Sequence, residues 1–181
     1  MKRFTAPVLV LLLSLLFIGC DKFKDKRFST TIVKDLHINI TDNSGSVDVS
    51  LNETITSLIN SELNAVKENI KSYELVRIKY KIWEYVGDDA ATFSGSLGLG
   101  NLNSTMPGVS YAFNDISLKA GNDDSDYVII SLNSTDIDKI EQYFLDTNGL
   151  KLFLEGNVTH VPVSFILQVV VDVDAIAETK E

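Results

Sequence analysis

The chain has 181 residues, of which 25 are acidic and 16 basic, and its formal net charge at pH 7 is −9. Phosphate contacts need lysine and arginine, so an acidic chain without a basic patch interleaved with aromatic residues argues against a nucleic-acid partner. The chain has one cysteine, which excludes an internal disulfide.

The first nineteen residues have the pattern of a signal peptide. Lys2 and Arg3 form a short basic head, and residues 6–19 then carry no charge. A transmembrane helix needs roughly 20 apolar residues, so this run is short for a membrane span. It fits the apolar region of a signal peptide, which is typically about 7–15 residues long. An uncleaved N-terminal anchor is the alternative.

The apolar run ends in Phe17-Ile18-Gly19-Cys20, which resembles the lipobox of bacterial lipoproteins. That resemblance covers only residues 1–20, and the family prefers leucine where this chain has Phe17. It implies cleavage before Cys20 and acylation of this cysteine with chains such as palmitate. Two acyl chains give stable anchoring to a membrane. The predicted organisation is a signal peptide over 1–19, a lipidated tether over 20–27 and a single β-rich domain over 28–181.

The expected location follows from the same resemblance. The protein is expected in a bacterial cell envelope, anchored to membrane lipid through acylated Cys20 and facing the periplasm or the outside. Residues 22–27 are rich in lysine and arginine, which are attracted to an anionic bilayer, while the body is acidic. Asp21 resembles the inner-membrane retention signal of enteric lipoproteins, a rule that other bacteria do not share, so the choice of membrane stays open.

Alternation of apolar and polar residues dominates the body and predicts strands. Residues 28–40 and 47–51 alternate on either side of a turn-rich segment at 42–46, which predicts a hairpin. Further strands are expected at 76–82, 91–102, 109–118, 127–133 and 151–160. The last strand, from Val163, is apolar on both faces, which is typical of a central strand.

Two segments have helical spacing instead. Ile55, Leu58, Leu63 and Val66 recur at helical intervals within 54–70, with Thr54 as a candidate cap. A second amphipathic helix is expected over 135–148, capped by Ser134 or Thr135 and ended by Gly149. The predicted fold is mainly β (α+β), an antiparallel β-sandwich-like domain with two amphipathic helices. A half-barrel wrapped on a helix is the alternative.

Asp123, Asp124 and Asp126 form the densest acidic cluster and are candidate metal ligands. Calcium takes several oxygen ligands, but the spacing differs from an EF-hand loop, so an acidic loop is the simpler interpretation. His37 and His160 lie in strand patterns without zinc-site spacing. No metal and no cofactor is therefore expected.

Four aromatic residues, Trp83, Tyr85, Tyr111 and Phe113, lie in neighbouring predicted strands and are a candidate binding surface for a peptide or sugar. Core packing is the alternative for them. The glycine-rich stretch at 94–100 lacks the order of a nucleotide-binding loop and predicts a strand against which something packs closely.

These observations predict a non-enzymatic binding or interaction module whose envelope protein or glycan partner is not identified. A carrier of a lipid or small apolar ligand, with a cavity between the sheet and the helix at 54–70, is the alternative. A hydrolase ranks below both, because no acid, base and nucleophile can be assembled from the pattern.

Overall fold

The computed structural model describes residues 23–123 and 126–180, and within them the chain is mainly β. The strands are β1 (Phe23–Ile40), β2 (Ser46–Thr56), β3 (Ile70–Val86), β4 (Thr92–Gly100), β5 (Val109–Ser117), β6 (Val128–Ile130), β7 (Gly149–Thr159) and β8 (Val163–Lys180). The helices are α2 (Ser61–Ala65), α3 (Leu118–Asp123) and α4 (Ser134–Thr147), with single 3-10 turns η1 (Ser57–Ile59) and η2 (Lys67–Asn69). The predicted signal peptide and Cys20 lie outside the described residues.

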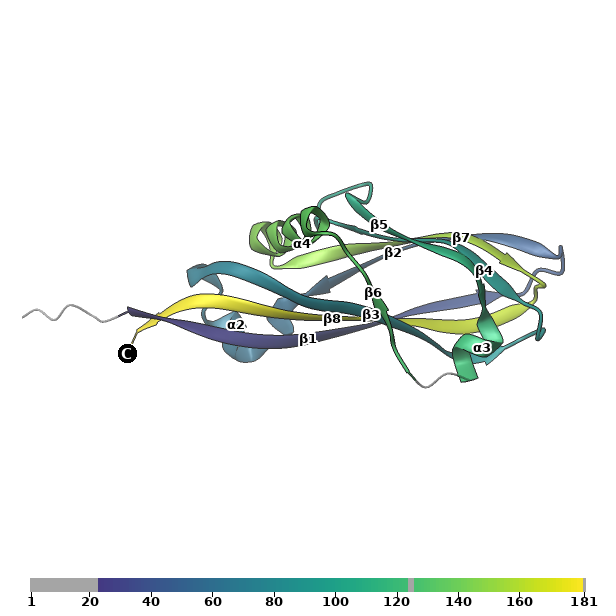
Figure 1. Ribbon diagram of the computed structural model, residues 1–181, viewed down its shortest axis with the longest axis horizontal. Coiled ribbons are helices and arrows are strands. Elements are labelled where there is room, and N and C mark those ends of the chain that lie inside the picture. The colour runs from purple at the N-terminus through teal and green to yellow at the C-terminus, as the bar shows by residue number, and fades with distance from the viewer. Residues whose placement is uncertain (1–22, 124–125, 181) are drawn as a thin grey trace, which may run out of the picture.

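The strands of the described part form two antiparallel four-stranded sheets, ordered β1-β8-β3-β6 and β2-β7-β4-β5. The two orders correspond position by position, because each strand of the first sheet is connected directly along the chain to the strand at the same position in the second sheet. Three of these continuations are short bends, at 41–45, 87–91 and 160–162, and the fourth runs through α3. The molecule is thus a four-stranded antiparallel sheet folded over on itself, with the bends gathered at one end (Figure 1).

The predicted hairpin at 28–51 is wrong. β1 pairs with β8 from Phe23↔Lys180 to Ile40↔Val163, and β2 pairs with β7 from Ser46↔Thr159 to Thr56↔Gly149. The turn signal at 42–46 therefore marks a bend that takes the chain from one sheet to the other. Opposite it lies the bend at 160–162, and the His160 N–H donates to the Gly45 carbonyl oxygen at 2.7 Å. The expectation that β8 is a central strand is confirmed.

The core lies between the two sheets and consists of the apolar residues that alternate along each strand. Rings from opposite sheets meet there: Tyr80 of β3 and Phe113 of β5 have centroids 5.1 Å apart, and Phe93 of β4 and Phe165 of β8 are 6.5 Å apart. The glycine-rich β4 packs closely against its own chain. A Cβ on Gly95 would lie 2.1 Å from the Glu155 carbonyl oxygen, and one on Gly98 would lie 2.5 Å from Pro107.

The predicted helix over 54–70 does not form as one helix. Residues 54–56 belong to β2, and the rest is split into η1, α2 and η2. Side chains start these short pieces: Thr56 Oγ1 accepts from the Leu58 N–H, and Asn60 Oδ1 accepts from the N–H groups of Glu62 and Leu63. Such local bonds compete with a continuous helix. Leu63 is fully buried.

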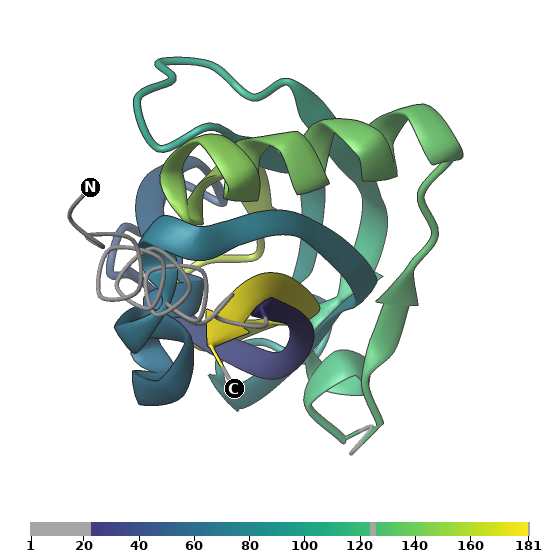
Figure 2. The same cartoon turned by 90° about the vertical axis from the view of Figure 1, so that its left-hand side faces the viewer.

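The second predicted helix is confirmed as α4, although its caps differ. Asn133 Oδ1 accepts from the Asp136 N–H, and Asn148, with φ 55°, ends the helix in place of Gly149. Phe144 packs on Tyr73 of β3 with ring centroids 5.3 Å apart. Viewed along the long axis, α4 covers one side of the strands and the pieces around α2 lie on another (Figure 2).

A buried polar network joins the end of α4 to η1 and β3. The Tyr73 hydroxyl lies 2.8 Å from Ser57 Oγ and 2.8 Å from Asn148 Oδ1, to which it donates. Asn148 also accepts at its carbonyl oxygen from the Ser57 N–H at 2.9 Å. Ser57 is fully buried and Tyr73 nearly so, so these bonds satisfy groups that have no access to water.

Residues 23–27, expected to be part of a tether, form the first part of β1 instead and pair with residues 176–180 of β8. Their charges are matched locally: Lys26 pairs with Glu62, and Arg27 pairs with Glu74 and Asp174. The end of the molecule where β1 starts is therefore an ordered, charge-balanced surface. In the described part of the chain, every helix falls short of the length and apolar character that a membrane span requires.

Candidate functional site

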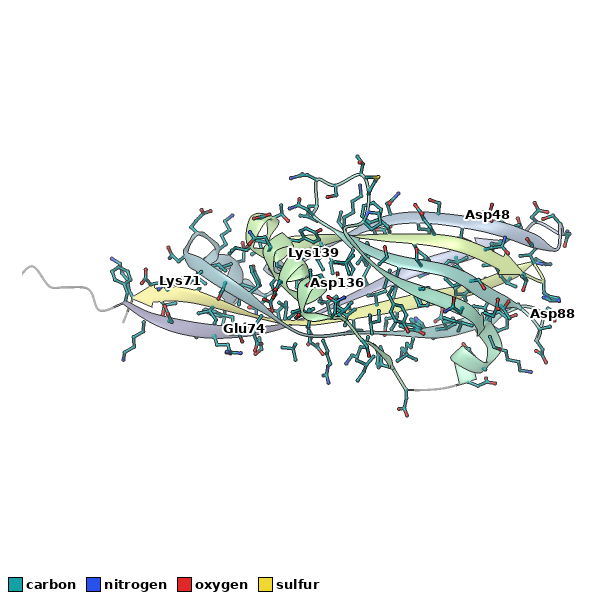
Figure 3. The ribbon with its side chains drawn as sticks, turned by 45° about the horizontal axis from the view of Figure 1, so that its top comes forward. Asp48, Lys71, Glu74, Asp88, Asp136 and Lys139 are labelled. Carbon is teal, nitrogen blue, oxygen red and sulfur yellow. The ribbon has the colours of Figure 1, made fainter. Side chains whose placement is uncertain are left out.

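The end of the molecule opposite the start of β1 carries an open hollow between the three short bends. It is lined by Gly45, Gly87, Asp88, His160, Val161 and Pro162 and has a volume of about 690 Å³. We call this the loop end. Asp48 and Asp88 lie at this end, whereas Lys71 and Glu74 lie at the other (Figure 3).

The bend at 87–91 is held in place by bonds within the chain. The Tyr85 hydroxyl donates to the Asp88 carbonyl oxygen, and Asp88 Oδ1 accepts from the Ala90 N–H at 2.8 Å. A Cβ on Gly87 would lie 2.7 Å from Val163 Cγ1, so the bend packs directly on the start of β8. Burial, followed by the charges of Asp88 and Asp89, raises the pKa of Tyr85.

The loop end is acidic. Lys119 pairs with Asp89 at 2.5 Å, and this hydrogen bond is the main cause of the raised pKa of Lys119. Within residues 23–123 and 126–180, Asp42, Asp48 and Asp88 form no ion pair. This end therefore presents carboxylates whose charge is available to a cationic partner.

A groove opens on the flank of the molecule between β1 and β2, next to the loop end. Its lining comes from both sheets, and its volume is about 370 Å³. Three apolar side chains, Ile38, Ile40 and Val49, are buried at its floor. The polar lining residues are His37, Asn39, Thr41, Asp42, Asp48 and Ser50. We call this the edge groove, because β1 and β2 are both edge strands of their sheets.

Chemically, these two features can recognise a ligand by charge and by apolar contact. The exposed His160 ring contacts the Thr159 hydroxyl at 3.2 Å, and His37 lies on the rim of the edge groove. Among the described residues, no three His, Cys, Asp or Glu side chains are grouped so that they could hold a metal ion. Asp123 and Asp126, two of the candidate ligands, are exposed, and Asp124 lies outside the described residues.

The candidate aromatic surface does not exist as one surface. Phe113 is buried between the sheets, where it contacts Tyr80, Phe93 and Tyr111. The error has a simple cause: residues 111 and 113 share the inner face of β5, and sequence alternation does not say which face is inner. Phe113 cannot contact a partner in this fold.

Trp83 and Tyr85 lie elsewhere. Trp83 is on the outer face of the first sheet, opposite Ile166, with the Lys81 ammonium 5.5 Å from the Trp83 ring. Tyr85 packs against the core beneath the bend at 87–91. The structure therefore brings together Tyr111 and Phe113 only, and does so in the interior.

The outer face of the first sheet also holds a compact ionic cluster. Asp172 is buried and accepts from Thr31 Oγ1 at 2.6 Å and Arg77 Nε at 2.5 Å, with Lys79 Nζ at 3.7 Å. Burial alone would raise the pKa of Asp172, but the hydrogen bonds from Thr31 and Arg77 and the positive charges of Lys79 and Arg77 lower it. Every oxygen of the buried carboxylate is thus used within the fold.

Neither the loop end nor the edge groove was predicted from the sequence. His160 was expected inside a strand, and the signal at 42–46 was interpreted as a hairpin turn. Thr159-His160-Val161-Pro162 did contain a usable signal, because a proline cannot donate within a central strand and favours a boundary there. The groove had no signal of its own, since it arises only when β1 and β2 enter different sheets.

No family model matches this chain, and no curated protein matches it. Among solved structures, it is similar to a chain described as "Desmodium yellow mottle tymovirus", with 14% identity and a TM-score of 0.39 over 100% of this chain and 93% of that one. A second, described as "Structure of infectious bursal disease virus Gx strain", has 13% identity and a TM-score of 0.32 over 86% of this chain and 41% of that one. At these values neither similarity supports a functional conclusion.

Proposed function

We propose that this protein is a bacterial envelope lipoprotein, held on a membrane by acylated Cys20, and that its β-rich domain is a non-enzymatic binding module. Its two stacked sheets with folded-over connections correspond to a β-sandwich of the jelly-roll type. That architecture hosts many functions, so the proposal depends on the sites and not on the fold.

One spatial relationship is the main support. β1 begins at Phe23, three residues after Cys20, and it runs along the length of the molecule to the bends at the opposite end (Figure 1). An acyl anchor on Cys20 would therefore place the start of β1 next to the membrane. The loop end would then point away from the membrane, and the edge groove would lie beside it, where a partner has access.

The acyl chains would anchor the protein, and electrostatic attraction of basic residues to the membrane would contribute little. Lys26 and Arg27 are paired with carboxylates, and Lys71 at the same end pairs with Asp25 and Glu178. Each buried methylene contributes about 0.8 kcal/mol, so two acyl chains suffice without a free basic patch.

The test is mass spectrometry of the protein extracted gently from its own cell envelope, with Cys20→Ser as the matched variant. We expect an N-terminus at Cys20 that carries acyl mass, and detergent-phase partitioning that the variant loses. An intact Met1 without acyl mass would overturn the anchor. A co-purifying protein or glycan of defined mass would support the binding function, whereas turnover of a substrate by the purified protein would contradict it.

A second candidate function, the transport of a small apolar ligand, has one observation in its favour. A pocket of about 240 Å³ lies between β3, β5, α3 and β6, lined by Tyr80, Lys81, Ile82, Ile116, Ser117, Ala120, Gly121, Asp126 and Val128. This pocket does not lie where the cavity was expected, between the sheet and residues 54–70. Its volume is below the roughly 300–1,000 Å³ typical of ligand sites, so we rank this function second. A bound mass of a few hundred daltons in the native spectrum would reverse the ranking.

A further inference from the structure

We propose that the part of β1 beside the edge groove, residues 35–41, accepts an extended segment of a partner protein by strand addition, and that this segment carries lysine or arginine. The inference deepens the proposed binding function and rests on it. It names the surface, the mode of binding and the chemistry of the partner.

The first support is the direction of the backbone groups of β1. In an antiparallel pair, the N–H and C=O of one residue point the same way, and successive residues alternate. The Lys24 carbonyl oxygen accepts from the Thr179 hydroxyl on β8, whereas the Ser29 carbonyl oxygen accepts from Asn60, which lies off the free edge. The β1–β8 register continues without a shift to Ile40. Asp35, His37 and Asn39 therefore present their N–H and C=O groups to the free side.

The second support is that the rest of this edge is blocked. Near the start of β1, the segment 57–69 covers the edge through the Asn60–Ser29 bond and the Lys26–Glu62 pair. In the middle, Lys34 points between the sheets and bridges to Glu53 of β2 at 2.7 Å. An inward-pointing charge on an edge strand is a known device against strand pairing. The open stretch therefore begins after Lys34.

At the opposite side of the first sheet, side chains satisfy backbone N–H groups that no neighbouring strand reaches. The Leu75 N–H of β3 donates to Glu141 of α4 at 2.8 Å, and the Tyr85 N–H donates to Asn122 of α3 at 2.9 Å. Side chains thus cover the part of β3 that the three-residue β6 leaves unpaired. In the described part of the chain, residues 35–41 have no such cover from a side chain to their free backbone groups.

The third support is the chemistry of the surroundings. The buried floor of Ile38, Ile40 and Val49 can pack against apolar side chains on the inner face of an added strand. Among the described residues, the one hydrogen-bond donor to Asp35 is the neutral Gln168 amide, at 2.8 Å, and Asp42 accepts from the Ser44 N–H. Neither carboxylate is neutralised by a described cation, so positive side chains on the outer face of the added strand are favoured.

The free length suits a short segment. Seven residues at about 3.3 Å each span roughly 23 Å, enough for a strand of five to seven residues. Main-chain hydrogen bonds would supply affinity, and alternate side chains would supply specificity.

The probe is an acetylated and amidated seven-residue peptide of alternating valine and lysine, with binding to the acylated full chain in detergent micelles measured by fluorescence anisotropy. We expect saturable binding, at least tenfold weaker when glutamate replaces lysine. Two further peptides are N-methylated at the valine or at the lysine nitrogens. An added strand turns only alternate N–H groups toward β1, so one of the two must lose binding and the other must keep it.

The variant is His37→Pro, with His37→Ala as its control. Proline removes an N–H that faces the free edge and is tolerated there, so β1 keeps its pairing with β8. We expect His37→Pro to weaken binding of the lysine peptide at least tenfold and His37→Ala to change it less than twofold. Asp42→Asn, which keeps the bond from the Ser44 N–H, should weaken binding two- to fivefold and reduce its salt dependence.

Several outcomes would overturn the inference: no binding of the lysine peptide, equal binding of both methylated peptides, or unchanged binding by His37→Pro. The methylated peptides decide the question even where His37→Pro fails to fold. If the parent protein self-associates and His37→Pro makes it monomeric, the segment added to β1 comes from a second copy of this chain and not from a different partner. Mass spectrometry of the same preparation shows independently whether Cys20 is acylated. A missing lipid anchor and missing peptide binding at the edge groove can therefore be told apart.

Discussion

The N–H of His160 donates to the carbonyl oxygen of Gly45 at 2.7 Å, and this bond links the two bends that carry neighbouring strands from one sheet to the other. Both residues have a left-handed backbone, with φ 55° at His160 and 88° at Gly45. The bend at 41–45 has five residues and the bend at 160–162 has three, so the two bends differ in length. The hydrogen bond between Gly45 and His160 therefore fixes how the two bends lie at the loop end.

The first prediction concerns the backbone at His160. A left-handed conformation costs a residue with a Cβ roughly 1–2 kcal/mol, and glycine avoids this cost while gaining freedom in the unfolded chain. We expect His160→Gly to be more stable than His160→Ala by about 1 kcal/mol in urea unfolding. Gly45→Ala is the converse control: a Cβ there meets open space, so a loss of about 1 kcal/mol would come from the backbone alone. Equal stability of the two His160 variants would contradict the strained conformation.

The second prediction concerns the buried network around Tyr73. Tyr73→Phe removes the donor to Asn148 Oδ1 and the partner of Ser57 Oγ while it keeps the ring contact with Phe144. Asn148 Oδ1 then loses its donor, whereas Ser57 Oγ keeps its bond to the Asn148 carbonyl oxygen at 3.1 Å. We therefore expect a loss of about 1–3 kcal/mol in the free energy of unfolding. The control is Tyr127→Phe, whose hydroxyl bonds Gln168 on the outer face, and it should cost less. A Tyr73→Phe protein as stable as the parent would mean that water replaces the lost hydroxyl.

The third prediction is a loss of stability in alkali. Burial, followed by the neighbouring Tyr111, raises the pKa of Tyr80 to about 12. Below pH 10 the phenol is neutral in both states and has no effect. Above pH 10 the unfolded state releases the proton and the folded state holds it, so stability falls as pH rises toward 12.

Unfolding of the parent and of Tyr80→Phe, measured in urea from pH 8 to 11.5, tests this. Phenylalanine does not ionise, so the alkaline decline should be shallower in the variant. Parallel curves for the two proteins would show that Tyr80 ionises alike in the folded and unfolded states.

The fourth prediction is an acid-dependent contribution from Asp172. The folded-state pKa of this carboxyl is lowered, so its stabilisation is present above the unfolded value of about 3.9 and is lost as pH falls through the folded value. At pH 7 we expect Asp172→Asn to cost about 1–2 kcal/mol, the scale of a charge-assisted hydrogen bond with a half-exposed partner.

The difference between the parent and Asp172→Asn should shrink as pH falls below 4. Glu178→Gln is the matched control, because its pair with Lys71 is exposed and exposed pairs contribute less than about 1 kcal/mol. A difference that stays constant from pH 7 to pH 3 would assign the cost to packing and not to charge.

Local pattern in the sequence was sufficient for most of the elements. The apolar residues on both faces from Val163 onward predicted a central strand, and β8 lies between β1 and β3. The amphipathic helix expected over 135–148 is α4, and its side chains Ile140 and Phe144 are fully buried. These properties depend on near neighbours in the chain, which is why periodicity reports them. The lipid anchor at Cys20 also comes from the sequence alone and stays a prediction.

Tertiary structure decided which strands pair and which faces meet. Alternation shows that one face of a strand is buried, but it does not name the neighbouring strand, and residues 28–51 satisfy a hairpin and a bend between sheets equally well. The choice was made by β7 and β8, which follow much later in the chain and pair with β2 and β1. That long-range pairing placed residues 54–56 of the expected helix in β2 and opened the groove between the two edge strands. Phe113 turned inward because β5 pairs with β4 and packs against the first sheet.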